Sequence, residues 1–259
     1  MKALIFDVRL NSLFSIRIPY TWQSALIYPV LPPSAVIGML ANALQRVENK
    51  KHPREYLKEL ESKIIWVGAR LLSPCIVKSY TTSAIFNWKI KMGGKATNSL
   101  GREFGFTKNV QIIAVMKNED NLLSMLLLGL KRTSLTMGDS ESALTIERIY
   151  PIYNIKEYTI EKEIETFFPF PFSFEQIEIT AGTGRVYMIH EKCMKDESKK
   201  NLPLITYIFP IKEENSILFP TTLKIKPKNK INVLELETLN INNNLPFPQG
   251  SLLVKNTRS

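Results

Sequence analysis

Apolar residues dominate the start of the chain, with polar residues spaced among them. Residues 2–18 are rich in Leu, Ile, Val and Phe, and this texture predicts one long strand or two short ones. Prolines at positions 29, 32 and 33 end the extended region. Apolar residues then recur at helical spacing after Ser34, a residue type that often caps helices, and predict a helix from about Ser34 to Arg46. A second short helix is expected from Pro53, because proline is favoured at the first helical position.

The texture changes between Ile65 and Met116, where β-branched and aromatic residues collect in three runs that predict strands. The last two runs are separated by a segment from Met92 to Gly105 that contains four glycines. A long, glycine-rich connection between two strands predicts an extended hairpin that protrudes from a sheet. Asp120 then precedes an apolar stripe at helical spacing, and residues 144–150 have the texture of a strand again.

The predicted order is strand, helix, strand, strand, helix, strand, which is the ferredoxin-like pattern. From Pro151 onward, short strand-like runs are separated by prolines, which indicates further β structure. We therefore predict an α+β protein with two domains. Residues 1–153 form a ferredoxin-like, RRM-like domain with a protruding β-hairpin thumb at about residues 84–110, and residues 154–259 form a smaller, β-rich C-terminal domain.

Composition narrows the class of protein. The chain has 259 residues, 44% of them hydrophobic, which is enough for a core without disulfides or metals. Cys75 and Cys193 lie far apart and belong to no C-x-x-C pair, so a zinc site or a disulfide framework is not expected. No apolar run approaches the ~20 residues of a membrane-spanning helix, and Asp7 and Arg9 interrupt the N-terminal run. We expect a cytoplasmic protein that requires no membrane, metal or cofactor.

The formal charge is +10 at pH 7, from 34 Lys and Arg against 24 Asp and Glu. Half of this excess lies between Lys78 and Lys108, where the predicted hairpin carries a single acid, Glu103. The same stretch also contains Phe86, Trp88, Phe104 and Phe106. Cations neutralise phosphates and aromatic faces stack unpaired bases, so the mixture favours single-stranded nucleic acid. The alternative is a solubilised hairpin whose aromatic side chains pack on its own base.

Two stripes of charge alternate along predicted strands. Lys224, Lys226, Lys228 and Lys230 form a basic stripe, and Glu161, Glu163 and Glu165 form an acidic one. A two-residue period places each stripe on one face of a strand. We interpret the basic stripe as a solvated face, with contact to a partner as the alternative. The acidic stripe is interpreted as a solvated face or a complementary contact with another subunit.

Groups for catalysis are sparse. The chain has two histidines, His52 before a helix and His190 in a strand-like run, and we interpret both as structural. No nucleophile elbow, P-loop or H-E-x-x-H motif is present. Residues 182–185, Gly-Thr-Gly-Arg, allow close approach of a phosphate to the backbone, but such sequences are common in tight turns. The sequence favours binding over catalysis.

Two segments resemble a known family. Residues 17–44, RIPYTWQSALIYPVLPPSAVIGMLANAL, are similar to the N-terminal signature of the fifth family of CRISPR-associated RAMP proteins. That signature has an Arg-x-Pro on an early strand, a Tyr-Pro pair, a Pro-Pro-Ser helix start and Gly-Met-Leu within the first helix. Residues 137–143, MGDSESA, resemble the family's Leu-Gly-x-Ser-Glu segment, with Met137 in place of the leucine. The resemblance covers roughly residues 1–153.

The resemblance implies a subunit of a type I interference complex of the Cascade kind, which serves antiviral defence. In that family a ferredoxin-like RAMP domain with a thumb hairpin holds the single-stranded 5′ handle of the crRNA and caps the backbone filament of RAMP subunits. The implied partners are the crRNA, a backbone RAMP subunit and the large or small Cascade subunit. We expect the RNA contacts at Arg17, Ser34, Trp88, Lys89, Lys91, Lys95, Arg102, Lys108, Gly138 and Ser140.

Some members of the family resemble metal-independent endoribonucleases that cut pre-crRNA with Tyr, Lys and His, the last two adjacent. Here no histidine follows a lysine of the hairpin, and the adjacent pair Lys51 and His52 lies far upstream. Lys89 or Lys91 can supply the lysine, but the expected general acid/base is missing. We therefore expect a non-catalytic binder of the handle, with the endoribonuclease as the alternative function.

Overall fold

The computed structural model describes residues 1–21, 24–85, 97–139, 141–173, 175–194, 202–236 and 252–254. Its first part has the predicted ferredoxin-like order: β1 (Lys2–Leu10), α1 (Pro33–Glu48), β3 (Ile64–Leu71), β6 (Asn109–Met116), α3 (Asp120–Arg132) and β8 (Ala143–Ile149). These strands are antiparallel and lie in the order β8-β1-β6-β3, so the first strand lies between the last and the third, as in ferredoxin-like domains. The predicted α+β fold is confirmed. Two short elements accompany this core: α2 (Pro53–Lys63) follows α1, and β7 (Leu135–Thr136) pairs with β8.

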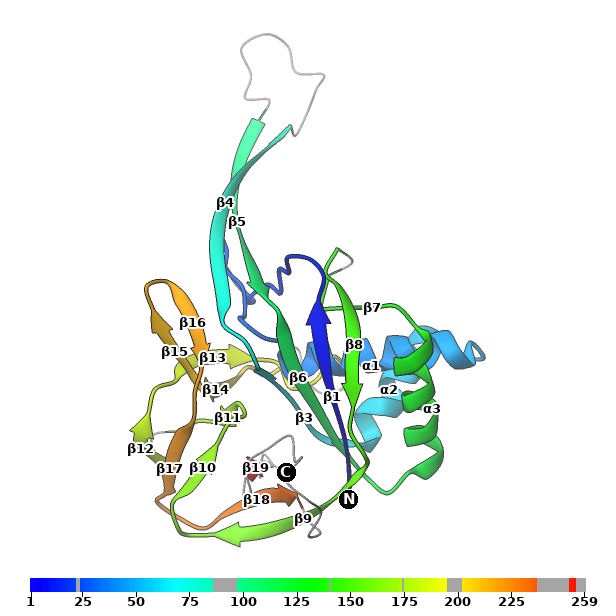
Figure 1. Cartoon of the computed structure of the whole chain (residues 1–259), viewed down its shortest axis with the longest axis vertical. Coiled ribbons are helices and arrows are strands. Elements are labelled where there is room, and N and C mark those ends of the chain that lie inside the picture. Colours follow the sequence, from blue (N-terminus) through cyan, green and yellow to red (C-terminus); the bar gives the residue numbers. More distant parts are fainter. Residues whose placement is uncertain are drawn as a thin grey trace.

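The central strands of the main sheet, β1 and β6, are buried on both faces. The three helices lie together on one face (Figure 1). Leu4 and Phe6 of β1 face this side and share a core cluster with Leu40 of α1 and Leu126 of α3. Neighbouring residues of β1 point the other way, into a second cluster with residues from the C-terminal half, such as Ile5 with Phe168 and Leu234. The period-2 alternation of a strand thus produces two cores, one on each face.

The hairpin predicted from the glycine-rich segment is formed by β4 (Cys75–Ile85) and β5 (Thr97–Thr107), which extend away from the body of the molecule (Figure 1). Its register runs from Cys75 opposite Thr107 to Ile85 opposite Thr97. The connection expected between Met92 and Gly105 is therefore wrong in its second half, because β5 already begins at Thr97. Gly101 and Gly105 lie within this strand, where backbone pairing with β4 outweighs their low strand propensity.

Short strands flank the part of the hairpin nearest the body of the molecule, residues 75–81 and 101–107, which we call its foot. β2 (Ser24–Ala25) runs parallel to β5, and β16 (Ile217–Pro220) pairs with β4. β15 (Ile211–Glu214) completes this five-stranded sheet beside β16. The hairpin is therefore anchored at its foot by residues from the first thirty positions and from the C-terminal half.

The C-terminal half is β-rich, as predicted. β9 (Tyr153–Ile160), β18 (Ile231–Leu236) and β19 (Leu252–Val254) extend the main sheet beyond β1. Two three-stranded sheets follow: β10 (Ile164–Thr166), β17 (Leu223–Pro227) and β12 (Ile177–Gly182), then β11 (Phe170–Pro171), β14 (Ile205–Phe209) and β13 (Arg185–Ile189). The predicted boundary after residue 153 falls at the start of β9, a strand of the main sheet, and the division into two domains stays a prediction.

The helix termini differ in detail from the expectations. α1 begins at Pro33 with Pro32 as its N-cap, so Ser34 lies inside the first turn and does not cap the helix. Proline in the first turn loses no intrahelical hydrogen bond, which explains the earlier start. α2 begins at Pro53 as predicted, and the Nδ1 atom of His52 accepts a hydrogen bond from the backbone N–H of Arg54.

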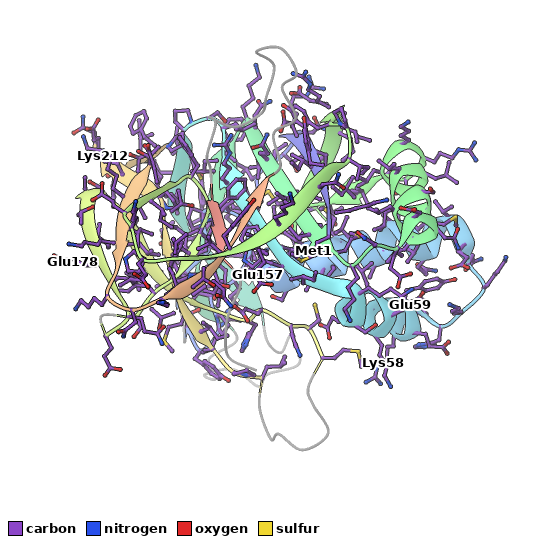
Figure 2. The ribbon with its side chains drawn as sticks, turned by 90° about the horizontal axis from the view of Figure 1, so that it is seen from below. Met1, Lys58, Glu59, Glu157, Glu178 and Lys212 are labelled. Atoms are coloured by element: carbon purple, nitrogen blue, oxygen red, sulfur yellow. The ribbon has the colours of Figure 1, made fainter. Side chains whose placement is uncertain are left out.

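Charged side chains cover the outside of the molecule; Lys58, Glu157, Glu178 and Lys212 all lie at the surface (Figure 2). Within the described part of the chain, no helix is both long enough and apolar enough to cross a bilayer.

Candidate nucleic-acid interface

The register of the hairpin gathers aromatic and basic side chains on one face. Three cross-strand pairs lie on this side, and we call the set the aromatic face: Ile76 opposite Phe106, Lys78 opposite Phe104, and Tyr80 opposite Arg102. The rings of Tyr80 and Phe104 meet edge to face, with centroids 5.8 Å apart. The guanidinium of Arg102 lies 4.7 Å from the centroid of Phe104. Tyr80 is 51% exposed, which leaves its ring open to a base.

The opposite face of the hairpin is turned inward. Phe14 is fully buried and bridges Gly105 through backbone hydrogen bonds in both directions. Glu103, the single acid of the predicted hairpin, accepts a hydrogen bond from the backbone N–H of Ile27 at 3.0 Å. Because the acid is used inward, the two strands of the hairpin place no carboxylate among the three cross-strand pairs of the aromatic face.

Arg102 is held at the foot of the hairpin by two other segments. Its Nε donates to the Oγ of Ser15 at 3.0 Å, and Ser15 in turn donates to the carbonyl of Glu103 at 3.0 Å. The Nη2 of Arg102 lies 3.8 Å from the Oδ2 of Asp139, which accepts the backbone N–H of Ser15 at 3.0 Å. The guanidinium thus has fixed neighbours along one edge and an aromatic ring on one face.

The segment that resembles the family around Gly138 is packed against residues 13–16. Gly138 has a φ of +87°, and a Cβ at this position would lie 2.8 Å from the Cγ1 of Ile16. Both facts require glycine here. The Oδ1 of Asp139 accepts hydrogen bonds from the backbone N–H of Ser142, at 2.8 Å, and from its hydroxyl. Residues 137–143, the second segment of the resemblance, therefore lie against residues 13–16, directly before the first segment, which the sequence alone does not reveal.

Two other predicted contacts lie near this foot. Arg17 is exposed and bridges Ile27, and its Nη2 donates to the carbonyl of Thr21 at 2.7 Å. Lys108 is also exposed and follows the last residue of β5; its backbone N–H donates to the Oγ of Ser73 at 3.0 Å. Both side chains are accessible to an anion.

Ser34 is positioned differently from the expectation. Its backbone N–H donates to the carbonyl of His190 at 3.2 Å, and its carbonyl accepts from the Sγ of Cys193 at 3.0 Å. The N–H expected to be free for a phosphate therefore has a partner within the chain. Trp88, Lys89, Lys91, Lys95 and Ser140 lie outside the described residues, so their predicted contacts stay predictions.

Sequence reasoning missed Tyr80 as a site residue. The signal was present, because Lys78 and Tyr80 are two residues apart, as are Arg102, Phe104 and Phe106. Such spacing places each set on one face of a strand. Only the register shows that the two sets share the same face.

The two charge stripes of the C-terminal half lie side by side within the chain. Lys224 on β17 is opposite Glu165 on β10, and Lys226 is opposite Glu178 on β12. Lys230 forms an ion pair with Glu161, with Nζ and Oε1 3.0 Å apart. The side chains of both stripes are exposed, so the interpretation as solvated faces is confirmed, and antiparallel pairing also brings opposite charges together there.

The other candidate reactive groups, His190 and residues 182–185, make contacts typical of a structural role. The Nδ1 of His190 lies 3.0 Å from the carbonyl of Pro203. Gly182 has a φ of +90° and is packed directly against the backbone of Thr222, and Arg185 pairs with Glu213 at 3.0 Å. This geometry favours the tight-turn interpretation of residues 182–185. Among the described residues, no three His, Cys, Asp or Glu side chains are grouped as metal ligands would be.

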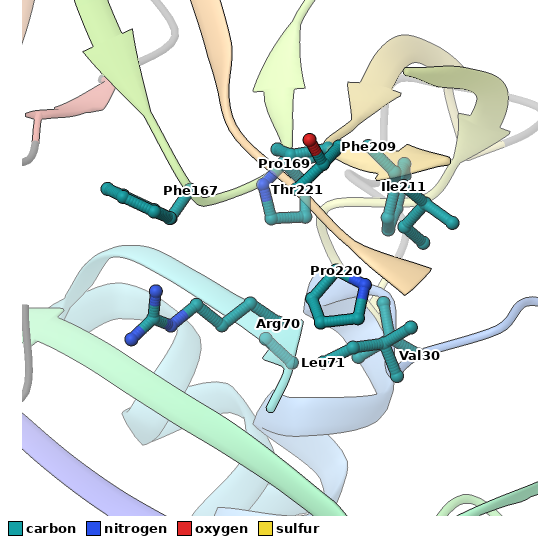
Figure 3. Close-up of a pocket in the computed structure, with 11 residues that line it drawn as sticks. Val30, Arg70, Leu71, Phe167, Pro169, Phe209, Ile211, Pro220 and Thr221 are labelled. Carbon is teal, nitrogen blue, oxygen red and sulfur yellow. The ribbon is translucent and has the colours of Figure 1, made fainter. Parts of the chain in front are cut away.

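The sheet face on which RNA-recognition motifs stack bases is closed here. Phe167 and Phe168 lie over Arg70 of β3, each ring centroid 5.3 Å from its guanidinium. Phe167 and Arg70 also line a narrow cavity with Pro220 and Thr221 (Figure 3). Burial lowers the pKa of Arg70 to about 10. With the sheet face covered, the aromatic face of the hairpin is the exposed aromatic surface suited to a nucleic acid in the described part of the chain.

Beneath Phe167 and Phe168, polar side chains of the main sheet form a hydrogen-bonded network. Nε of Arg70 donates to Gln111 at 2.8 Å, and Gln111 donates to Asp7 at 2.8 Å. The hydroxyl of Tyr150 donates to the other oxygen of Asp7 at 2.6 Å. Burial, followed by the bond to Asp7, raises the pKa of Tyr150 to about 12. These hydrogen bonds satisfy the polar groups and stabilise the covered sheet face.

No protein-family model matches the chain, and no curated protein sequence does. Among solved structures, a CRISPR protein from Archaeoglobus fulgidus superposes with a TM-score of 0.60 over 98% of this chain and 99% of that chain, at 14% identity. A chain of the type III-B Cmr-beta complex bound to cognate target RNA and AMPPnP has a TM-score of 0.46, with 11% identity and 86% of each chain covered. A chain of a CRISPR RNA-guided surveillance complex has a TM-score of 0.39, with 13% identity over 87% of this chain and 91% of that chain. The likeness to the Archaeoglobus protein is one of fold, and the strand order of this chain is ferredoxin-like.

Proposed function

We propose that this protein is a non-catalytic RNA-binding subunit of a CRISPR type I interference complex, in which it holds the 5′ handle of the crRNA and caps the RAMP filament. The observation that carries the proposal is the aromatic face, where Tyr80 and Phe104 are flanked by Lys78 and Arg102. Such a surface combines phosphate neutralisation with base stacking. The assignment to CRISPR is supported by the resemblance of residues 17–44 and 137–143 and by the fold shared with the Archaeoglobus protein.

The partners follow from the same resemblance. They are the crRNA, a backbone RAMP subunit, and the large or small subunit of the complex. Co-expression with the filament subunit and a guide RNA tests this part, and co-purification of all three in one particle is the expected result. A filament that assembles on the guide RNA and excludes this protein would contradict the capping role.

RNA binding is tested by fluorescence anisotropy with a labelled single-stranded RNA that carries the repeat-derived handle, against a scrambled RNA. Phe104→Ala removes a ring of the aromatic face and is expected to weaken binding by about 1–3 kcal/mol, the usual contribution of one stacked base. Tyr158→Ala is the matched control, since Tyr158 is an exposed aromatic residue of β9, outside the hairpin. Equal effects of the two substitutions would argue against stacking on the hairpin.

Salt dependence measures the phosphate contacts. If about five or six phosphates are neutralised, the slope of log affinity against log salt is expected near about −4 for a single strand. A slope near zero, or equal affinity for handle and scrambled RNA, would contradict the proposed function.

The non-catalytic part of the proposal rests on the surroundings of the two histidines, which cap a helix and contact a loop carbonyl. Purified protein incubated with repeat RNA and EDTA is expected to leave the RNA intact. Site-specific cleavage that disappears in a His190→Ala variant would establish the metal-independent endoribonuclease instead.

A further inference from the structure

Arg102 is held in place more firmly than the other described cations of the hairpin. Its Nε is bonded to Ser15, its Nη2 lies near Asp139, and its face lies over Phe104. Lys78 and Lys108 have no side-chain hydrogen bond or ion pair within the described residues. A free arginine side chain has many rotamers, and fixing it beforehand reduces the entropy lost on binding.

The contacts leave one edge of the guanidinium free. Arginine has five N–H donors, and the Nη1 pair has no partner within the described residues. Asp139 forms only a loose ion pair with Arg102: its two oxygens accept hydrogen bonds from the backbones of Ser15 and Ser142, and Oδ2 lies 3.8 Å from Nη2. That separation is longer than a direct hydrogen bond. Arg102 therefore presents an oriented, charged edge to solvent, next to a ring on which a base can stack.

We infer that Asp139 and Ser15 are positioning residues that hold Arg102 for one phosphate of a single-stranded RNA. The phosphate meets the Nη1 edge while the neighbouring base lies on the aromatic face at Tyr80 and Phe104. This inference rests on the proposed RNA-binding function. It gives the MGDSESA segment a role through Asp139, whose oxygens face inward to the protein, and does not require this residue to touch the RNA.

Stabilisation of the fold is not a sufficient explanation for the ion pair between Arg102 and Asp139. The side chains of Arg102 and Asp139 are 37% and 22% exposed, and ion pairs this accessible add little to stability. A lysine at position 102 would keep the charge but lose the planar fork that Ser15 and Asp139 hold.

The test is a set of double-mutant cycles in the full-length protein, with anisotropy of the labelled handle RNA as the readout. Arg102→Ala is expected to weaken binding about tenfold, as for loss of a charge-assisted contact. Ser15→Ala and Asp139→Asn are expected to weaken binding several-fold in the wild-type background and to have no further effect in the Arg102→Ala background. Arg102→Lys is expected to bind about as weakly as Arg102→Ala while keeping a steeper salt dependence.

Arg9 provides the matched control, because it pairs with Glu147 at 3.6 Å, is similarly exposed, and lies on β1 opposite Asn109, outside the aromatic face. Arg9→Ala is expected to leave RNA affinity unchanged. Thermal melts of each variant separate folding from binding. Asp139→Asn keeps one of the two acceptor oxygens that serve the Ser15 and Ser142 N–H groups, whereas Asp139→Ala would remove both.

The outcomes distinguish the proposed RNA-binding function from the positioning role of Ser15 and Asp139. Wild-type protein that does not bind the handle RNA contradicts the proposed function itself. Wild-type protein that binds, but whose Ser15→Ala and Asp139→Asn losses persist undiminished without Arg102, keeps the function and overturns the positioning role.

Discussion

The ring of Phe14 occupies the space in which a side chain at position 105 would begin. A Cβ placed on Gly105 would lie closer to three ring carbons of Phe14 than van der Waals contact allows. Phe14 is completely buried and is paired with Gly105 through backbone hydrogen bonds. The glycine therefore roots the hairpin in the body of the protein.

Gly105→Ala is expected to lower the free energy of unfolding by about 1–3 kcal/mol, because the methyl group overpacks a buried ring that has no room to move. Urea unfolding followed by circular dichroism measures the change. Gly38→Ala is the control of opposite sign: a Cβ at Gly38 of α1 would have nothing within 4 Å. Alanine in a helix interior is expected to stabilise by about 0.5–1 kcal/mol. Destabilisation by both substitutions would contradict this account.

Gly38 also shows that the sequence alone does not reveal which helical glycine lies against another helix. A glycine within a helix often marks the close approach of another backbone, but open space surrounds Gly38. The close approach is at Gly129 of α3, where a Cβ would lie 2.9 Å from the carbonyl oxygen of Ala43 in α1. Helical periodicity predicts each helix, but not which faces of the two helices meet.

The two charge stripes give a second prediction. Lys224 and Lys226 lie opposite Glu165 and Glu178, so their charges are balanced within the chain. A Lys224→Gln/Lys226→Gln variant is expected to bind handle RNA within about twofold of wild type, whereas Lys78→Gln/Arg102→Gln is expected to reduce the salt slope by about 1.4. Both variants remove two cations, so the comparison controls for net charge. Equal losses would place RNA on the basic stripe as well.

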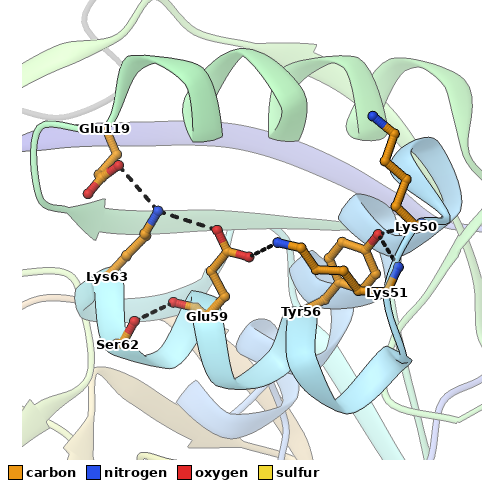
Figure 4. A network of polar contacts seen from close by, with 7 residues as sticks. All are labelled: Lys50, Lys51, Tyr56, Glu59, Ser62, Lys63 and Glu119. Atoms are coloured by element: carbon orange, nitrogen blue, oxygen red, sulfur yellow. Dashed lines mark hydrogen bonds and ion pairs between the residues drawn. The ribbon is translucent and has the colours of Figure 1, made fainter.

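The ion pairs around Glu59 predict a small effect at low pH. The carboxylate accepts from Lys51 at 2.9 Å and from Lys63 at 3.3 Å, and Lys63 also reaches Glu119 (Figure 4). The hydrogen bond from Lys51 lowers the pKa of Glu59, so its stabilisation is present above the unfolded value and is lost as the pH falls below about 4.5. Because the side chains are partly exposed, Glu59→Gln is expected to cost only about 0.5 kcal/mol at pH 7 and less than that at pH 3. Denaturant unfolding of both proteins at the two pH values measures this; a larger cost at pH 3 than at pH 7 would contradict it.

The order of elements could be predicted because it depends on local patterns. Helical spacing after Pro33 and from Asp120, and β-branched runs near Ile65 and Val110, each specify an element from neighbouring residues. The extent of β5 could not, since its glycines resemble a loop and only pairing with β4 makes them a strand. Charge and aromatic content pointed to the hairpin, whereas its neighbours Ser15 and Asp139 are more than a hundred residues apart and meet only in the fold.

The closed sheet face predicts how stability changes in alkali. Burial and the bond to Asp7 raise the pKa of Tyr150 from 10.0 to about 12, so the folded state favours the neutral phenol. This stabilisation is fully present below pH 10 and is lost as the pH rises from about 10 to about 12. Tyr150→Phe leaves an oxygen of Asp7 without its donor and is expected to cost about 1–3 kcal/mol at pH 8.

The free energy of unfolding is measured for wild type and for Tyr150→Phe at pH 8 and at pH 11.5. The difference between the two proteins is expected to be smaller at pH 11.5, because only wild type has a phenol at position 150 that must either stay neutral or ionise at that pH. Tyr28→Phe is the matched control, since Tyr28 is a buried tyrosine with a pKa raised to about 12 whose hydroxyl donates to the neutral carbonyl of Met188 at 2.5 Å. Loss of that neutral bond leaves no charge unpaired, so Tyr28→Phe is expected to cost less at pH 8 than Tyr150→Phe. A difference for Tyr150→Phe that stays constant between the two pH values would show that the bond to Asp7 does not govern alkaline stability.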